Sequence, residues 1–350
     1  MRAAESSEKS SISMCFVAPV LQALRESGVD ADAVLSEAGI PPGLQLVPQV
    51  RVSPPRYAAL MRLAARSLDD EFFGQDSRRM KVGSFAMLAQ IAIHGRTLNG
   101  ALDIITRFFN LLLDDLRSEL GEHGDSAVVT LHRRQPGPPI RLFAHEALLV
   151  FIHRLACWLV NRRIPIRGAA FCYLEPPHGA EYRVLYSPHL QFSKPETAIS
   201  FDREYLELPV VRDEAALTEY LRAAPETLLV QYKDSHGLGA RIRARLRRLH
   251  PDDWPSFEAL ARDIHVSEPT LRRRLEAEGQ SYRLIKDQVR RDIAIDRLSS
   301  SGLSITGIAA EIGFAEPSAF HRAFKKWTGV GPGEYRRTGD VARQLGDPIR

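Results

Sequence analysis

Two arginines, Arg273 and Arg322, stand at matching places in two segments near the end of the 350-residue chain. Apolar residues lie two positions to either side of each: Leu271 and Leu275 around the first, Phe320 and Phe324 around the second. At about 100° per residue, a helix that buries such a pair points the central arginine directly away from its core. A guanidinium group matches the O6 and N7 edge of guanine in the major groove, and it also matches phosphate oxygens. The pattern predicts two helices that each offer an arginine to nucleic acid or, in the alternative, to solvent.

The residues around each arginine predict a helix-turn-helix unit. Ser267 has the character of an N-cap for a helix over Glu268–Glu278, and a short helix containing Leu260-Ala261 precedes it. Ile308-Ala309 repeats that pair ahead of the second arginine. Tyr282–Leu298 is amphipathic and predicts a long helix that connects the two units rigidly. One such match would indicate only a pair of antiparallel helices, but the repetition favours paired nucleic-acid-binding units.

Positive charge is concentrated in the last third of the chain. Residues 231–350 contain 22 Lys and Arg against 16 Asp and Glu, whereas the whole chain has 47 against 43. A basic region attached to a near-neutral body is typical of a module that binds a polyanion. Two recognition helices about 34 Å apart would enter successive turns of the major groove.

Residues 256–336 closely resemble the DNA-binding domain of AraC/XylS-type transcription regulators. The resemblance lies in SFEALARDIHVSEPTLRRRLEAEGQSY, IKDQVRRDIAIDRL and LSITGIAAEIGFAEPSAFHRAFKKWTGVGPGEYR. It implies an all-α domain over 241–337 with two helix-turn-helix units joined by a long helix, and a tail over 338–350. The residues implied in DNA contact are Pro269, Thr270, Arg272, Arg273 and Arg274 in the first unit, and Pro317, Ser318, His321, Arg322, Lys325 and Lys326 in the second. Base-edge contacts are implied for the second, fifth and sixth positions of each recognition helix, which are Pro269, Arg272, Arg273 and Ser318, His321, Arg322.

Three residues depart from the family pattern. Pro269 offers no donor, so the first recognition helix depends on its arginines. His265 stands where the family usually has glycine in the first turn, and a positive φ there is tolerable for histidine but not ideal. Glu316 replaces an aspartate that would cap better. Pro332 is expected to begin a last short helix. The aromatic signature residues expected in the core are Phe314, Trp327 and Tyr335.

The remainder of the chain predicts a helix-rich α+β domain over 14–230, followed by a linker over 231–240. The first 13 residues are expected to form an unstructured lead. Helical spacing dominates from residue 14 to about residue 120, including a helix that Thr97 opens. Beyond it the expected elements are strands over Ser126–His132, Gly168–Tyr173, Arg183–Tyr186 and Ala198–Phe201, and an apolar helix over His145–Val160.

This N-terminal body resembles the ligand-binding domain of one AraC-family branch that responds to small metabolites or signals. The match lies in Thr97–Leu102 and in YSPHLQFSKPETAISFDREYLELPV at 186–210. It is unlike the β-rich cupin sensor of the arabinose regulator. The resemblance implies effector binding and dimerisation by 14–230, but it identifies neither the effector nor the residues that bind it. Apolar stripes at Phe108-Phe109 and Leu111–Leu113 also favour a homodimer.

Several functions are excluded by what the chain lacks. It has no GxxxxGK[ST], GxSxG, GxGxxG or CxxC, and Leu149 occupies the second histidine position of the HExxH-like string that His145-Glu146 begins. We therefore expect neither an enzyme nor a cofactor or metal. No apolar run reaches the ~18 residues of a membrane span, because His153 and Arg154 interrupt Ala147–Val160. Three scattered cysteines and the absence of a signal peptide predict a cytoplasmic protein with reduced thiols.

Some charged and titratable residues allow two interpretations. His145 and His153 either face one pocket or are ordinary core residues, and Arg162, Arg163 and Arg167 either hold an anionic effector or are solvated. The arginine-rich run 241–248 either meets phosphate or binds acidic residues of the N-terminal body.

The sequence thus predicts a sequence-specific transcription regulator whose binding to double-stranded promoter DNA is modulated by a small molecule. RNA polymerase is a further candidate partner. The alternatives are a DNA-binding regulator whose N-terminal domain only dimerises, and an enzyme with an attached DNA-binding domain. A regulator without an effector would lack a ligand-sized cavity in its N-terminal domain.

Overall fold

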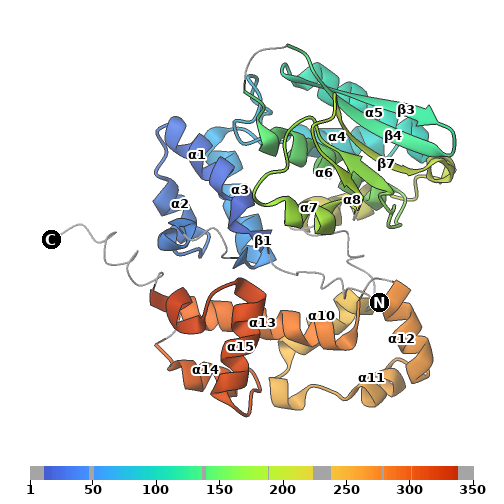
Figure 1. Cartoon of the computed structure of the whole chain (residues 1–350). Helices are drawn as coiled ribbons and strands as arrows, with labels where there is room; N and C mark the ends of the chain where they lie inside the picture. The colour runs from blue at the N-terminus through green and yellow to red at the C-terminus, as the bar shows by residue number, and fades with distance from the viewer. Residues whose placement is uncertain are drawn as a thin grey trace. The chain divides into compact units, whose positions relative to one another are not determined.

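The computed structural model describes residues 12–46, 51–135, 139–187, 189–223, 238–277, 280–300 and 302–337. The chain forms two compact units (Figure 1). The first unit contains residues 15–34 and 57–232; the second contains residues 10–14, 35–56 and 233–350. Segment 35–56 therefore groups with the C-terminal part of the chain, and Arg56 at its end forms an ion pair with Asp296 (3.3 Å). The expected lead ends in a strand, because β1 (Ile12–Ser13) pairs with β2 (Arg51–Val52).

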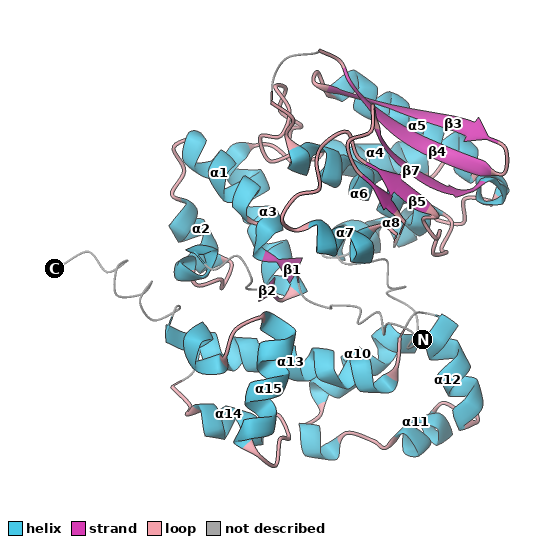
Figure 2. Cartoon of the chain, viewed as in Figure 1, coloured by secondary structure: helices cyan, strands magenta, loops and turns pink. Residues whose placement is uncertain are grey.

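The first unit is built on a five-stranded sheet with the order β3-β4-β7-β5-β6 (Figure 2). Its strands are β3 (Leu116–His123), β4 (Ser126–Arg133), β5 (Gly168–Ala170), β6 (Leu190–Gln191) and β7 (Thr197–Asp202). Neighbouring strands are antiparallel except β5 and β6. Its helices are α1 (Ala18–Glu26), α2 (Ala31–Glu37), α3 (Pro54–Leu68), α4 (Ser84–Ala92), α5 (Leu98–Leu112), α6 (Leu142–Leu159), α7 (Gly179–Leu185) and α8 (Glu214–Ala223), with α2 and α3 crossing the boundary between the units.

Alternation along the strands explains how the sheet is covered. Ala127, Val129 and Leu131 of β4 are buried, while the residues between them are partly accessible. Helix α5 packs on β3 and α6 packs on β7. Thr97 caps α5, and its side chain accepts a hydrogen bond from the Gly100 N–H (3.4 Å).

Helix α6 is the central element of the first unit. It is long and apolar enough to cross a membrane by length and composition, but 89% of its 18 residues are buried within the structure. The polar side chains of His153 and Arg154 are buried with the apolar residues around them. Burial of nearly the whole surface explains why the helix is apolar on all sides, as expected for a core helix.

In the described part of the second unit, the regular elements are helices, 3₁₀ turns and the β1–β2 pair. Its helices are α10 (Leu238–Arg248), α11 (Phe257–Asp263), α12 (Glu268–Ala277), α13 (Tyr282–Ser300), α14 (Ile305–Glu311) and α15 (Pro317–Thr328), with a further helix at 332–337. One apolar cluster joins α10, α11, α12 and the first half of α13. The α+β class of the N-terminal part and the all-α class of the C-terminal part are confirmed.

The structure corrects three local expectations. Residues 183–185 belong to α7 and not to a strand. Tyr182 in this helix and Tyr186 at its C-cap are buried four residues apart, which is a helical spacing. The segment was predicted as a strand because its residues are typical of strands. Strand β3 begins within the region expected to be helical. The sequence did not indicate it because this polar edge strand buries only Leu116 and Ser118. Helix α10 begins at Leu238, inside the expected linker, whose residues 231–237 lie outside the described part of the chain.

Candidate nucleic-acid interface

The first recognition helix, α12, is fixed by its cap and its buried face. The Ser267 Oγ accepts a hydrogen bond from the Thr270 N–H (3.4 Å) and lies 2.9 Å from the Thr270 hydroxyl. Leu271 and Leu275 are almost fully buried in the cluster shared with α10, α11 and α13. The Thr270 hydroxyl is therefore engaged at the cap. Residues 278–279, at the expected end of this helix, lie outside the described part of the chain.

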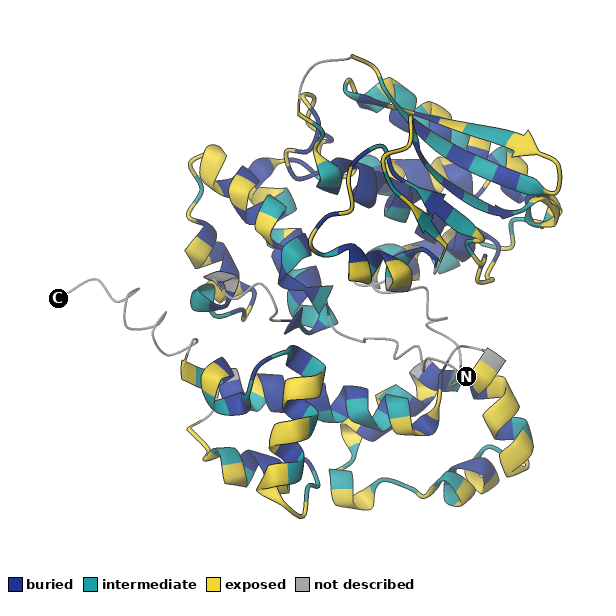
Figure 3. Cartoon of the chain, viewed as in Figure 1, coloured by how far each residue is buried: buried dark blue, intermediate teal, exposed yellow. Residues whose placement is uncertain are grey.

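The opposite face of α12 is exposed (Figure 3). It carries Pro269, Arg272, Arg273 and Arg274. The Arg272 guanidinium carbon lies 5.8 Å from the centre of the Phe257 ring on α11, a cation–π distance. Arg272 is thus held against the first helix of its own unit, while Arg273 projects from the side opposite Leu271 and Leu275.

The second recognition helix, α15, repeats this arrangement with aromatic residues. Phe320 and Phe324 are fully buried, with ring centroids 5.5 Å apart, and Tyr335 packs on Phe324 at 5.5 Å. Tyr335 is a core residue as expected, whereas Phe314 and Trp327 are only partly buried and contact each other. Proline 332 begins the helix at 332–337, also as expected.

The exposed residues of α15 lie opposite the two phenylalanines. They are Pro317, Ser318, His321, Arg322, Lys325 and Lys326. Glu316 is the N-cap residue, and its side chain makes no capping hydrogen bond, which agrees with the weak cap expected from its length. The structure therefore places ten of the eleven candidate residues on two exposed faces, and Thr270 is half-buried.

The turns of the two units share one backbone conformation. His265 has φ +55° and Gly313 has φ +77°, so both occupy the left-handed region. A Cβ on Gly313 would lie 3.2 Å from the Pro251 Cβ. In the second helix-turn-helix unit, Gly313 avoids both the strain of a positive φ and the clash with Pro251. In the first helix-turn-helix unit, His265 adopts the strained conformation.

Arg290 connects the two helix-turn-helix units and was not singled out from the sequence. Its guanidinium carbon lies 5.3 Å from the ring centres of both Trp254 and Phe314. Its Nε–H donates to the Ile312 carbonyl (3.0 Å). Burial lowers the pKa of Arg290, and the charges of Asp287 and Asp252 oppose that effect. The only sequence signal was an arginine in the middle of the connecting helix.

Three of the five arginines of α10 bind partners within their own unit. Arg245 forms an ion pair with Asp263 (2.6 Å) and Arg247 with Asp292 (2.8 Å). Arg243 donates to the Gln288 Oε1 (2.6 Å). These contacts tie α10 to α11 and α13, an arrangement that neither interpretation of the arginine run anticipated.

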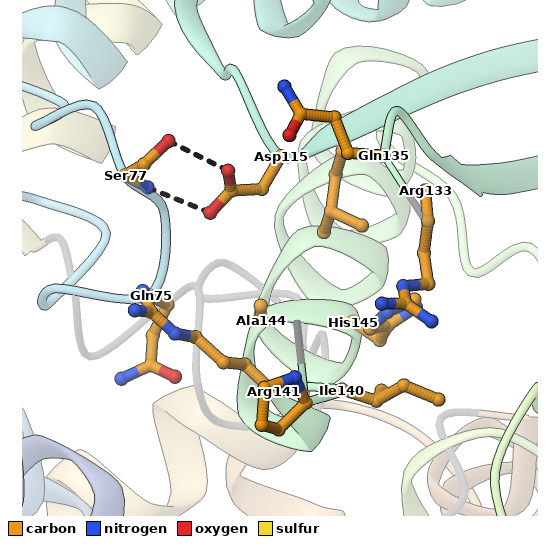
Figure 4. A pocket seen from close by; sticks show the side chains of 11 residues that line it. Gln75, Ser77, Asp115, Arg133, Gln135, Ile140, Arg141, Ala144 and His145 are labelled. Atoms are coloured by element: carbon orange, nitrogen blue, oxygen red, sulfur yellow. Dashed lines mark hydrogen bonds between the residues drawn. The ribbon is translucent and has the colours of Figure 1, made fainter. Parts of the chain in front are cut away.

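In the first unit, the residues considered for an effector separate into two groups. His145 lines a cavity of about 200 Å³ (Figure 4). His153 instead contacts the Ile164 carbonyl through Nε2 (2.9 Å), and burial lowers its pKa to about 3, so it is a neutral core residue. Arg162 lies over the Tyr205 ring, and Arg167 forms an ion pair with Asp202. Neither of these two arginines lines the cavity.

Glu146, beside His145, belongs to a buried polar cluster. Its carboxylate accepts a hydrogen bond from the Tyr182 hydroxyl and lies 3.0 Å from the His178 Nε2. The Tyr173 and Tyr182 hydroxyls are 3.1 Å apart. Among the described residues, no group of three or more His, Cys, Asp and Glu has the arrangement of a metal site.

Two family models match the chain. The arabinose-binding N-terminal domain of the AraC transcription regulator matches residues 28–210, and a helix-turn-helix domain matches residues 260–338. The chain belongs to the AraC family of transcription regulators. This AraC-family protein binds DNA through its helix-turn-helix domain and carries an N-terminal domain of the ligand-binding class.

Relatives of this AraC-family protein are similar over nearly their whole length. The ornithine utilization regulator of Pseudomonas aeruginosa is 28% identical, over 93% of this chain and 96% of its own. The transcriptional regulator VirS of Mycobacterium tuberculosis is 28% identical, over 91% of this chain and 94% of its own. The solved structure of the regulator CdpR from P. aeruginosa shares 23% identity with a TM-score of 0.32, over 92% of this chain and 97% of that one.

Proposed function

We propose that this AraC-family protein recognises a specific promoter sequence through α12 and α15 together, and that a small molecule bound in the first unit modulates this binding. The observation that carries the proposal is the repeated geometry of the two recognition helices. Each buries a pair of apolar residues and presents basic residues on the opposite side. A solvated arginine would have no reason to recur in the same place in both units.

The basic residues divide by position into two roles. Arg273 and Arg322 lie directly opposite the buried pairs and are proposed to contact base edges, where a bidentate arginine–guanine contact gives specificity. The second and fifth positions of each recognition helix, which in α15 are Ser318 and His321, lie beside these two arginines. Lys325 and Lys326 lie toward the end of α15 and are proposed to bind phosphate, which gives affinity without sequence information.

Modulation by a small molecule is supported by the first unit. It contains a cavity of metabolite size, whereas a domain that only dimerises would need none. The name of the relative from P. aeruginosa connects that protein with ornithine utilization, which favours a small metabolite as the effector class here. We also propose action in the cytoplasm, where promoter DNA and RNA polymerase are present.

The first unit is proposed to form the homodimer contact through α4. Met87 is 53% exposed and Ile91 is 42% exposed, and their spacing places both on one side of the helix. The stripe that the sequence indicated at the end of α5 is divided: Phe109 and Leu113 are buried in the protein's own core, whereas Leu111 is 81% exposed. A twofold dimer would present two pairs of recognition helices to DNA.

The proposal is tested by selecting duplexes from a random library with the full chain. Affinity for the selected site is then compared with affinity for unrelated duplexes over a range of salt concentrations. We expect one recurring sequence and a preference of about 10³-fold or more. Affinity should fall with salt at a slope near −0.9 per phosphate contacted. The absence of any enriched sequence, or affinity that does not change with salt, would contradict the proposal.

A further inference from the structure

The cavity beside His145 lies at the beginning of α6 (Figure 4). Its walls come from residues 75–77, the start of β3, the end of β4 and the first turn of α6. Its volume of about 200 Å³ equals about seven water molecules at liquid density. This is smaller than the ~300–1,000 Å³ of sites for drug-sized ligands, so the cavity suits a small metabolite.

His145 brings an unsatisfied hydrogen-bonding atom to this cavity. Its side chain is 2% exposed, and its Nδ1 has no hydrogen-bond partner among the described residues. An edge-to-face contact with Tyr173, with ring centres 5.9 Å apart, restrains the imidazole. Burial and the nearby charge of Arg133 lower the pKa of His145 to about 4, so the ring is neutral at pH 7. A buried polar group without a partner in the protein is suited to a bound ligand.

Positive charge surrounds this atom. Arg133 and Arg141 both line the cavity, and the Arg141 Nη1 donates to the Gly74 carbonyl (2.8 Å), which holds the guanidinium at the wall. Helix α6 has no acidic residue in its first turn, so no carboxylate there offsets the partial positive charge of its N-terminus. The cavity therefore favours a negatively charged group.

The remaining walls limit what the anion can be. The Asp115 carboxylate is directed to the Ser77 N–H (2.9 Å) and the Ser77 hydroxyl (2.7 Å), as the dashed lines in Figure 4 show. Its negative charge nevertheless disfavours a doubly charged phosphate. Leu116 and Ile140 supply apolar surface that an organic body would cover. These features fit one carboxylate on a small organic molecule.

We propose that this cavity binds a small organic carboxylate, with Arg133 and the His145 Nδ1 holding the carboxylate at the start of α6. Neutral His145 donates through Nδ1–H, and Arg133 supplies the charge. The inference rests on the proposed function, because it gives a chemical class to the effector proposed there. It also names binding residues, of which the sequence had offered only His145, as one of two interpretations of that side chain.

Thermal unfolding of the full chain in about 20 mM acetate, butyrate or benzoate tests the site, with the corresponding amides and potassium chloride as controls. We expect at least one carboxylate to raise the Tm of the first unit by about 2–4 °C, and its amide to have no effect. Inorganic phosphate at the same ionic strength should not reproduce the shift. A shift with phosphate alone, or with no carboxylate, would overturn the proposal.

Two variants assign the effect to this cavity. His145→Phe keeps an aromatic ring beside Tyr173 and removes the nitrogen, and Arg133→Gln removes the charge. Each should weaken carboxylate binding by about tenfold or more, because each removes a charge-assisted hydrogen bond. His123→Phe and Arg117→Gln are matched controls at exposed positions of β3 and should respond like the parent protein. Equal responses in all five proteins would overturn the assignment, and Arg133→Gln decides the matter if His145→Phe does not fold.

Affinity for the selected DNA site, measured on the same proteins, separates the two proposals. A variant that loses the carboxylate response but binds DNA normally supports the site. A carboxylate that shifts the Tm without changing DNA affinity supports the site and contradicts its role as an effector site. Failure of the parent protein to bind any sequence selectively contradicts the proposed function and leaves the test of the cavity unaffected.

Discussion

Arg273 and Arg322 are the residues on which sequence recognition should depend most. Each lies opposite the buried pair of its helix and carries the donor geometry that guanine requires. We expect Arg273→Ala and Arg322→Ala each to cost about 1–3 kcal/mol on the selected site and to relax the preference at the contacted base pair. Lys326→Ala should weaken all duplexes about equally, since it removes a phosphate contact.

Arg107→Ala is the control for these variants, because Arg107 is an exposed arginine of α5 and its loss changes the net charge by the same amount. It should leave DNA affinity unchanged when binding is measured by fluorescence anisotropy. An equal loss for Arg273→Ala on selected and unrelated DNA would show that Arg273 binds phosphate instead.

The sequence was sufficient to place these residues on the exposed faces of α12 and α15, because helical spacing fixes which side chains oppose a buried pair. It was insufficient for side chains whose role depends on residues distant in the chain. Arg272 has the same type and nearly the same position as Arg273, yet it packs on Phe257. Arg290 contacts one ring before it and one ring after it in the chain, and no local pattern marks that geometry.

At the scale of elements, the two turns offer a pair of opposite substitutions. Gly313→Ala should destabilise the second unit by about 1–2 kcal/mol, because a side chain at φ +77° is strained and meets Pro251. His265→Gly should stabilise it by up to about 1 kcal/mol, because glycine adopts the same conformation freely. Urea unfolding of the full chain measures both. A loss of stability in His265→Gly would mean that the imidazole makes a contact that outweighs the strain.

Arg290 should determine how firmly the two helix-turn-helix units are connected. Arg290→Met keeps a long side chain but removes the cation–π contacts and the bond to the Ile312 carbonyl. We expect a loss of about 1–3 kcal/mol in unfolding free energy. The affinity for the selected site should fall more than that for unrelated DNA, because only the former needs both helices in register.

Arg283→Met, at an exposed position of the same helix, is the matched control for Arg290→Met and should change neither stability nor selectivity. An Arg290→Met protein with the parent's stability and selectivity would show that apolar packing alone orients the two units.

Elements with strong periodicity and a good cap were predictable, and those defined by long-range pairing were not. Helices α5 and α13 followed from their apolar spacing, with Thr97 as the cap of α5, and α6 followed from its strongly apolar composition. Strand β3 is polar, and its extended conformation is stabilised by pairing with β4 from Leu116 to His123. Helix α7 contains residues typical of strands, and burial of Tyr182 against Phe171 accounts for its helical spacing.

For the whole molecule, dimerisation through α4 is the most accessible prediction. Met87→Glu and Ile91→Lys should each shift the protein toward monomer, because each places a charge in the proposed apolar contact. Leu174→Glu is the control, since Leu174 is also apolar, is 79% exposed and does not belong to α4. Light scattering at tens of micromolar measures the mass. A parent protein that is monomeric with and without DNA would contradict the dimer.

Both recognition helices of one chain should enter the major groove of the same duplex. Dimethyl sulfate protection of guanine N7 on the selected site tests it most directly, because N7 lies in the major groove. The account predicts two protected stretches on one face of the duplex, about 10 base pairs apart, for each bound chain. Arg322→Ala should expose one stretch and Arg273→Ala the other. A single protected stretch per chain, or protection that neither substitution changes, would contradict the account.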